Sequence, residues 1–160
     1  MSVRSVIERS ERDDGFTLVE LMIVVMILGV LMAIGLPAFL GARSRAQDSA
    51  ARQGAALTLE AAKIVYTAHS DFTEATTAEL EASEPSLTYV DAGVSSTNAS
   101  TASRDAPDAD TFIAAVWSAS GTCFFIRDQV GTGIDVGTIR GGTTADCTAG
   151  NSGAATFGSW

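Results

Sequence analysis

The hydrophobic and polar positions divide the chain into an apolar first part and a mixed remainder. From Phe16 to Ala42 the only charged residue is Glu20. As a helix, these about 27 residues would reach roughly 40 Å, which is enough to cross a bilayer. Val, Ile, Leu and Met occur on all sides of such a helix, as is typical of a helix surrounded by lipid or by similar helices. The pattern therefore predicts a membrane-spanning helix over residues 16–42.

Two other interpretations of this segment stay open. A secretory signal peptide would have a shorter apolar core followed by a small-residue cleavage site, which "LGA" at 40–42 approximates. A plain membrane anchor would need no special residues at positions 15, 16 and 20. The positive-inside rule does not settle the orientation, because three arginines lie on each side: Arg4, Arg9 and Arg12 before the segment, and Arg43, Arg45 and Arg52 after it.

The helical pattern continues beyond the apolar segment. Residues 43–69 are rich in Ala, Leu, Gln and Arg, which favour a helix. Five apolar residues recur at helical spacing and form a stripe: Leu57, Ala61, Ile64, Val65 and Ala68. We expect this amphipathic half of the helix to hold a small head domain through the stripe.

Small residues and one proline interrupt the apolar half of the helix. Gly29, Gly35 and Gly41 lower helix stability, and Pro37 removes one backbone hydrogen bond. A bent or locally loosened helix between residues 29 and 41 is one interpretation. Close packing of neighbouring helices at these small residues is another, and the two are compatible.

The second half of the chain reads as a polar connection followed by strands. Residues 70–110 form a polar connecting loop, with one short capped helical turn in "TTAELEASEP" that ends at Pro85. Strand patterns follow from residue 111, from residue 122 and near 134–139, separated by "SG" and "GTG" turns. Residues 111–160 are thus expected to form a small antiparallel sheet against the helix stripe. The predicted fold class is α+β.

The two cysteines, Cys123 and Cys147, both fall in the sheet region. After a membrane segment, a disulfide in an oxidising compartment is the natural interpretation, and two buried free thiols are the alternative. A bridge would close the C-terminal loop around the third strand, worth about 3 kcal/mol in the chain-entropy model. A small head with a modest core would benefit from this bracing.

Composition excludes several function classes. The net charge of −9 repels a phosphate backbone, so we predict no direct nucleic-acid binding. The single histidine, His69, has no adjacent nucleophile motif, and neither a C-x-x-C pair nor a glycine-rich phosphate loop occurs. We therefore predict no metal, no cofactor and no catalytic residue. The sequence indicates a structural protein rather than an enzyme.

The N-terminal motif resembles that of a known family. Gly15-Phe16-Thr17-Leu18-Val19-Glu20 and the following apolar run are similar to the prepilin signature of type IV pilins and pseudopilins, and Pro37 matches a proline common in that segment. The resemblance implies that a prepilin peptidase removes residues 1–15 as a leader by cutting between Gly15 and Phe16. Phe16 would then be N-methylated, and Glu20 would pair with the N-terminal amine of a neighbouring subunit. One departure is an acidic leader, with Asp13 and Asp14 directly before the glycine.

The resemblance also implies partners and location. The precursor would cross the inner membrane once, meet the peptidase, the methyltransferase and the pilus assembly machinery, and polymerise into a helical surface filament of identical subunits. A major pilin is the favoured reading. The alternatives are a pseudopilin or minor pilin of a secretion or DNA-uptake machine, and a membrane-anchored adhesin that does not polymerise. Adhesion, motility and DNA uptake are not distinguished by the sequence.

Overall fold

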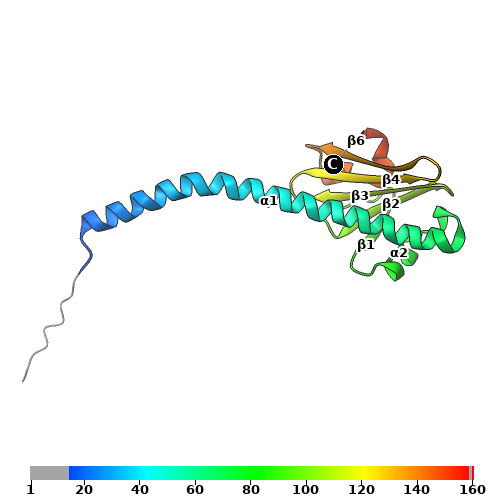
Figure 1. Ribbon diagram of the computed structural model, residues 1–160, viewed down its shortest axis with the longest axis horizontal. Helices are drawn as coiled ribbons and strands as arrows, with labels where there is room; N and C mark the ends of the chain where they lie inside the picture. Colours follow the sequence, from blue (N-terminus) through cyan, green and yellow to red (C-terminus); the bar gives the residue numbers. More distant parts are fainter. Residues whose placement is uncertain (1–14, 159) are drawn as a thin grey trace, which may run out of the picture. The chain divides into compact units, whose positions relative to one another are not determined.

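A single helix, α1 (Leu18–His69), joins the two parts of the chain in this computed structural model, which describes residues 15–158 and 160. Contacts divide the chain between Leu40 and Gly41 into two compact units. Besides α1, the helical elements are η1 (Phe72–Glu74), α2 (Thr77–Ser83), η2 (Thr144–Asp146) and η3 (Ala149–Ala154) (Figure 1). The strands are β1 (Thr88–Asp91), β2 (Thr101–Asp108), β3 (Thr111–Ser118), β4 (Thr122–Gln129), β5 (Gly133–Arg140) and β6 (Thr156–Gly158).

In the first unit, α1 is a regular helix through the whole apolar segment. Pro37 lies inside the helix, and Gly29 and Gly35 belong to it as well. The large apolar side chains from Leu18 to Leu40 are exposed, and the helix is long and apolar enough to cross a membrane. The prediction of an apolar helix in this region is confirmed. The loosening expected between residues 29 and 41 stays a prediction.

In the second unit, residues 41–160, α1 packs one face against the sheet. The buried positions recur every three or four residues: Ala51, Gly54, Ala55, Thr58, Leu59, Ala61, Ala62 and Val65. The expected stripe is therefore only partly right. Ala61 and Val65 are buried and Leu57 is half-buried, but Ile64 is 60% exposed and Ala68 is exposed. The face of α1 that packs on the sheet is lined by smaller residues than expected, because alanine and glycine let the helix approach the sheet closely.

The sheet contains six strands in chain order, from β1 to β6. Every neighbouring pair is antiparallel except β1 and β2, which are parallel. The three strands expected from the sequence correspond to β3, β4 and β5, and the α+β class is confirmed. The sheet is larger than expected, since β1, β2 and β6 were not foreseen.

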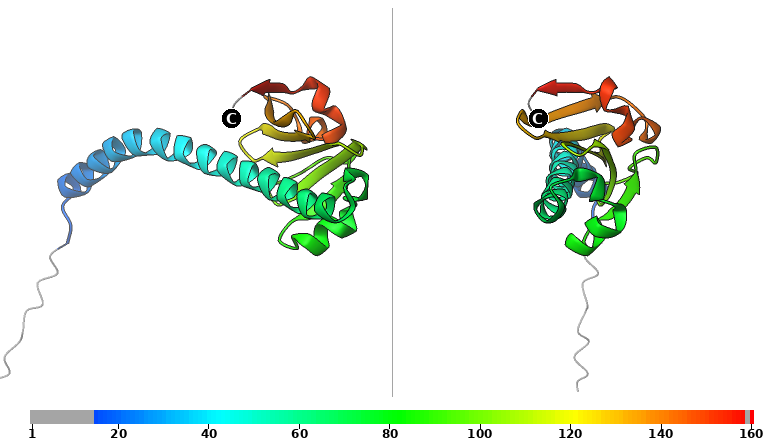
Figure 2. Two further views of the ribbon diagram at one scale, coloured as in Figure 1. Left: turned by 45° about the vertical axis from the view of Figure 1, so that its right-hand side comes forward. Right: turned by 90° about the vertical axis from the view of Figure 1, so that its right-hand side faces the viewer.

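Alternating side chains give the sheet two buried faces. Phe112, Ala114 and Val116 of β3 face α1 together with Phe124 and Ile126 of β4. The intervening side chains form a second cluster on the opposite face: Ile113, Ala115, Cys123 and Phe125, with Cys147 and Ala149 of the C-terminal segment. The sheet thus lies between α1 and the C-terminal segment, as Figure 2 shows. β3 is buried on both faces, which explains its almost uninterrupted apolar sequence.

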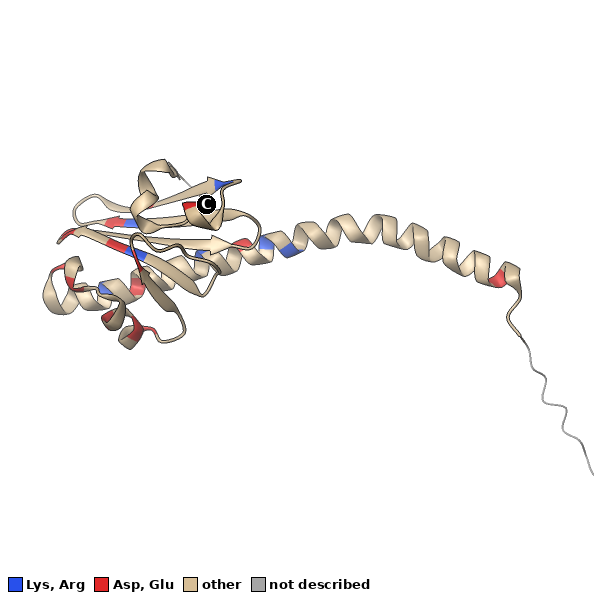
Figure 3. Cartoon of the chain, turned by 180° about the vertical axis from the view of Figure 1, so that it is seen from behind, with Lys and Arg blue, Asp and Glu red and all other residues tan. Residues whose placement is uncertain are grey.

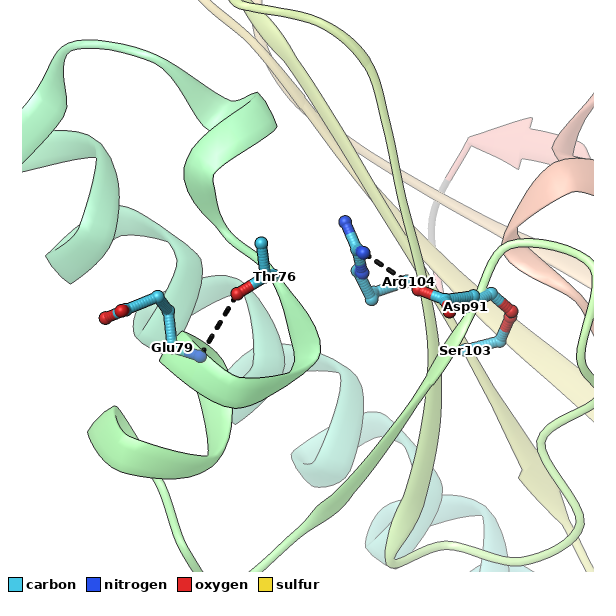
Figure 4. A network of polar contacts seen from close by, with 5 residues as sticks. All are labelled: Thr76, Glu79, Asp91, Ser103 and Arg104. Atoms are coloured by element: carbon cyan, nitrogen blue, oxygen red, sulfur yellow. Dashed lines mark hydrogen bonds and ion pairs between the residues drawn. The ribbon is translucent and has the colours of Figure 1, made fainter.

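The structure of residues 70–110 differs from the polar connecting loop that the sequence predicts. The short helix is confirmed as α2, where the Thr76 hydroxyl accepts a hydrogen bond from the Glu79 amide at 3.3 Å (Figure 4). The rest is not a solvated loop, because β1 and β2 form there. Arg104 of β2 binds the Asp91 carboxylate of β1 at 2.8 Å, and the Ser103 hydroxyl donates to the Asp91 carbonyl at 3.3 Å. Polar cross-strand contacts replace the apolar alternation that would have revealed these strands.

The C-terminal segment is fastened to the sheet by the disulfide between Cys123 and Cys147, with 5.4 Å between the two Cα atoms. The predicted pairing is confirmed, and the closed loop contains β5. Just before Cys147, the Asp146 carboxylate accepts hydrogen bonds from the amide and hydroxyl of Thr143, at 2.7 and 2.9 Å. These two donors hold the pKa of Asp146 below its usual range. The disulfide and the hydrogen bond from the Ala149 amide to the Ser103 hydroxyl of β2, at 2.9 Å, therefore fix the segment over the second core cluster.

Candidate processing and docking segment

The residues that precede α1 form a short non-helical stretch followed by a capped helix start. Gly15, Phe16 and Thr17 lie outside any helix or strand, and α1 begins at Leu18. The Thr17 hydroxyl accepts a hydrogen bond from the Glu20 amide at 3.1 Å, and the Thr17 carbonyl accepts one from the Leu21 amide at 3.2 Å. Thr17 is therefore the N-cap of α1.

The role of Thr17 was missed in the sequence analysis, although a signal was present. Threonine followed by glutamate three residues later is the spacing of a capping box. The cap fixes the first helical residue at Leu18. It thereby leaves the peptide bond between Gly15 and Phe16 outside the helix.

The Gly15–Phe16 bond is open on all sides in the described part of the chain. A Cβ atom added at Gly15 would meet nothing within 4 Å, and Phe16 is 82% exposed. A protease needs its substrate as extended backbone that it can surround, and a bond inside a helix would first have to unfold. This bond meets that requirement without any rearrangement of α1.

Glu20 lies in the first turn of α1 and is exposed. The free amides at a helix N-terminus favour a negative charge at this position. Within residues 15–158 and 160, the Glu20 carboxylate has no ion pair and accepts no hydrogen bond. The carboxylate is therefore available to a cation from outside these residues.

The apolar surroundings of Glu20 would make an unpaired carboxylate costly in hydrocarbon. Its neighbours along α1 are exposed apolar side chains, among them Leu18, Leu21 and Val24. A carboxylate among such side chains in hydrocarbon costs several kcal/mol unless it is paired or protonated. A partner with positive charge would remove most of that cost.

The glycine and proline positions remain compatible with both earlier interpretations. A Cβ atom at Gly29 or Gly35 would meet nothing within 4 Å, so no contact within the chain requires glycine there. Pro37 has no amide hydrogen, which leaves the Ala33 carbonyl without its usual helical donor. A role in helix flexibility or in contacts with other molecules stays a prediction for these residues.

The acidic side chains of the head are the groups whose arrangement decides whether a metal ion could bind. No group of three or more His, Cys, Asp or Glu side chains in the described residues is placed to hold a metal ion. Asp128 and Asp135, which flank the turn between β4 and β5, pair instead with Lys63 at 3.0 Å and with Arg127 at 2.6 Å. These carboxylates serve the packing of the head.

Comparisons with known proteins support the interpretation of the N-terminal segment. The family described as "Prokaryotic N-terminal methylation motif" matches residues 12–36. The type IV major pilin protein PilA of Myxococcus xanthus (strain DK1622) is 43% identical over 61 residues, which is 38% of this chain and 24% of that relative. The match thus spans about a quarter of the relative's length. No solved structure is significantly similar to the chain. Together, the prepilin methylation motif and the similarity to a major pilin support membership of the type IV pilin family.

Proposed function

We propose that the chain is the major structural subunit of a type IV pilus. It would be held in the inner membrane by residues 16–42, cut between Gly15 and Phe16, methylated on Phe16 and added to a helical surface filament. The observation that carries this proposal is the start of α1. The proposed cleavage bond lies outside the helix, and a carboxylate without an ion pair among the described residues lies one turn inside it.

The chemistry of the cut connects these two features. Hydrolysis after Gly15 gives Phe16 a free amine, which is protonated at neutral pH. A neighbouring subunit would place its own amine beside Glu20, so that two charges that are costly in hydrocarbon neutralise each other. A subunit in the wrong register leaves both charges unpaired, and this selects the docked arrangement.

The apolar surface of α1 supports the same proposal. Residues 18–40 expose large apolar side chains along the whole segment. Lipid covers this surface in the precursor, and the helices of other subunits would cover it in a filament. Helices packed inside and heads outside give contacts that do not close on themselves, which produces an open fibre.

Processing is tested by intact-mass analysis of surface material. We expect a chain that begins at Phe16 and carries one added methyl group. The Gly15→Val variant should remain uncut. Since a Cβ atom at Gly15 would meet nothing within 4 Å among the described residues, the loss of processing would reflect the peptidase and not the fold. A surface form that begins at Met1 or at Arg43 would disprove the assignment.

The role of Glu20 is tested with Glu20→Val, and with Glu60→Val as a matched loss of an exposed carboxylate on the same helix. Glu20→Val should insert and be cut normally but should assemble few or no filaments. Each incoming subunit would leave an amine unpaired, at a cost of about 2 to 5 kcal/mol. Glu60→Val should assemble normally. Normal filament yield from Glu20→Val would show that the carboxylate does not guide docking.

Abundance separates the major-subunit proposal from its alternatives. A major subunit should be the main protein of sheared filaments. A pseudopilin or minor pilin would be a trace component of that fraction, and an anchored adhesin would stay with the membranes. Quantification of the chain in the sheared and membrane fractions distinguishes the three cases.

A further inference from the structure

The charges of the head, residues 41–160, are distributed unevenly between its two ends. Nine of the nineteen acidic residues of the chain lie between Asp71 and Asp110, where Arg104 is the only basic residue. In Figure 3 acidic residues gather over α2 and the turns beside the end of α1. Arginines mark the part of α1 that first enters the head and the end of β5.

The acidic end consists of η1, α2 and the turn between β2 and β3. The Phe72 amide of η1 donates to the Ala109 carbonyl in that turn at 2.9 Å, which places these elements side by side. Exposed carboxylates project from all three elements: Glu74, Glu79, Glu81, Asp108 and Asp110. Within the described residues none of these five belongs to an ion pair.

The basic end consists of residues 43–48 of α1, the turn between β3 and β4, and the end of β5. Asp48 accepts hydrogen bonds from the hydroxyls of Ser118, at 2.7 Å, and Ser120, which fastens α1 to the turn. Arg140 pairs in register with Thr122, directly after that turn. The two elements therefore meet at one end of the head.

Three arginines are exposed at the basic end, and none of them has an ion pair within the described residues: Arg43, Arg45 and Arg140. The Nε atom of Arg45 donates a hydrogen bond to the Gly41 carbonyl at 3.1 Å, and its two terminal nitrogens have no hydrogen-bond partner among the residues that the structure describes. The acidic residues at this end, Asp48 and Asp146, already accept hydrogen bonds from Ser118, Ser120 and Thr143. The guanidinium groups of these three arginines are thus the charged groups at this end that are available to bind a partner.

The acidic end and the basic end of the head lie at opposite ends of the strands of the sheet. β3 runs from Thr111, next to the acidic end, to Ser118 at the basic end, and eight strand residues span about 23 Å. No single head can join its own ends across this distance. A carboxylate of the acidic end that pairs with these arginines would therefore belong to another molecule.

We infer that the basic end of one subunit, Arg43 with Arg45 and Arg140, docks on the acidic end of a second copy of this chain, on the carboxylates of η1, α2 and the β2–β3 turn. Complementary charges attract unlike ends, and like charges repel two acidic ends or two basic ends. The contact is head-to-tail and does not close, so it repeats along a fibre. The inference rests on the proposed filament, and it adds which surfaces of neighbouring heads meet.

A charge exchange in the full-length chain tests this contact. The first variant combines Arg43→Glu with Arg45→Glu, the second combines Glu81→Lys with Asp110→Lys, and the third carries all four changes. All four side chains are exposed, and none of the four residues belongs to an ion pair within the described chain. The control adds Glu60→Lys to the arginine variant, because Glu60 is an exposed carboxylate of α1 that belongs to neither end.

The expected readout is the amount of chain in sheared filaments. Each double variant should lose about tenfold, since attraction becomes repulsion at every added subunit. The fourfold variant should recover most of the yield, whereas the Glu60→Lys control should not. Export and the disulfide should be normal in every variant.

Three outcomes would overturn the contact. Unchanged filament yield in the double variants would show that the ends do not meet. Loss without recovery in the fourfold variant would show that the arginines bind something other than these carboxylates. A fall in membrane retention with unchanged filaments would assign the arginines to anionic lipid headgroups. If the unaltered chain formed no filaments, the proposed function itself would fail, which is a different result from any of these.

Discussion

Gly54 of α1 lies directly against the carbonyl oxygen of Ala99, in the connection between β1 and β2. A Cβ atom at Gly54 would be 2.5 Å from that oxygen and 3.4 Å from a methyl group of Val116. This contact sets how closely α1 approaches the sheet. It explains why a glycine interrupts an otherwise helix-favouring sequence.

The first prediction follows from this contact. Gly54→Ala should destabilise the head by about 1 to 3 kcal/mol, because the added methyl overlaps backbone that cannot move freely. Gly41→Ala is the matched control on the same helix, since its Cβ atom would meet only Arg45 at 3.8 Å. The control should raise the free energy of unfolding by up to about 1 kcal/mol, because alanine favours a helix more than glycine does. Denaturant unfolding of the detergent-solubilised chain measures both, and a stable Gly54→Ala variant would contradict the contact.

The second prediction concerns the disulfide. Cys147→Ser should lower the free energy of unfolding by about 3 kcal/mol, because the bridge closes a loop between residues 24 positions apart. The C-terminal segment should then be cut readily by added protease. Mass mapping of the unaltered protein without reductant should show one Cys123–Cys147 link. Two thiols open to alkylation in the exported form would refute the bridge.

The third prediction concerns the end of α1. Ser70 follows the last residue of the helix with a φ angle of 55°, in the left-handed region, and its amide donates to the Tyr66 carbonyl at 2.7 Å. Ser70→Gly should stabilise the head by about 0.5 to 1 kcal/mol by removing the steric cost of this conformation. Ser49→Gly, at an exposed position inside the helix, should instead destabilise it by about 0.5 kcal/mol. A loss of thermal stability in Ser70→Gly would contradict the argument.

The fourth prediction concerns alkaline pH. Burial raises the pKa of Tyr89 from 10.0 to about 12, with smaller contributions from Glu84 and Glu81. Below pH 10 the phenol is neutral in both the folded and the unfolded chain, so its contribution to stability is fully present. Between pH 10 and about 12 the unfolded chain loses the proton while the folded chain keeps it, and stability falls.

Tyr89→Phe should remove this part of the alkaline decline. At neutral pH it should cost about 1 kcal/mol, through loss of the hydrogen bond from the phenol to the Glu84 carbonyl. Unfolding free energies measured across the alkaline range, together with tyrosinate absorbance, report both effects. A variant with an unchanged alkaline decline would show that another group controls it.

Much of the molecule could be predicted because its signals are local. The apolar run, the strand patterns of residues 111–118 and 122–129, and two cysteines in one small head each have few physical solutions. Cleavage after Gly15 and docking through Glu20 were expected from a short motif, and both stay predictions.

The remainder depends on contacts between distant residues. β2 has a polar sequence with Pro107 near its end and an irregular register between Asp105 and Asp108. It is a strand because β1 and β3 pair with it, which no local pattern reveals. The exposed position of Ile64 likewise depends on where small residues allow α1 to touch the sheet.

The chain order of the strands has a consequence for how quickly the head can form. Each strand pairs only with strands adjacent to it in the sequence, so β2 to β5 can form by successive hairpins with little loss of loop entropy. Strand pairings that are local in the sequence favour rapid formation of this part of the sheet. The bond between Cys123 and Cys147 instead bridges past β5, so pairing of that strand helps to bring the two thiols together. A newly exported subunit should therefore form the bond faster once β5 has folded onto the sheet.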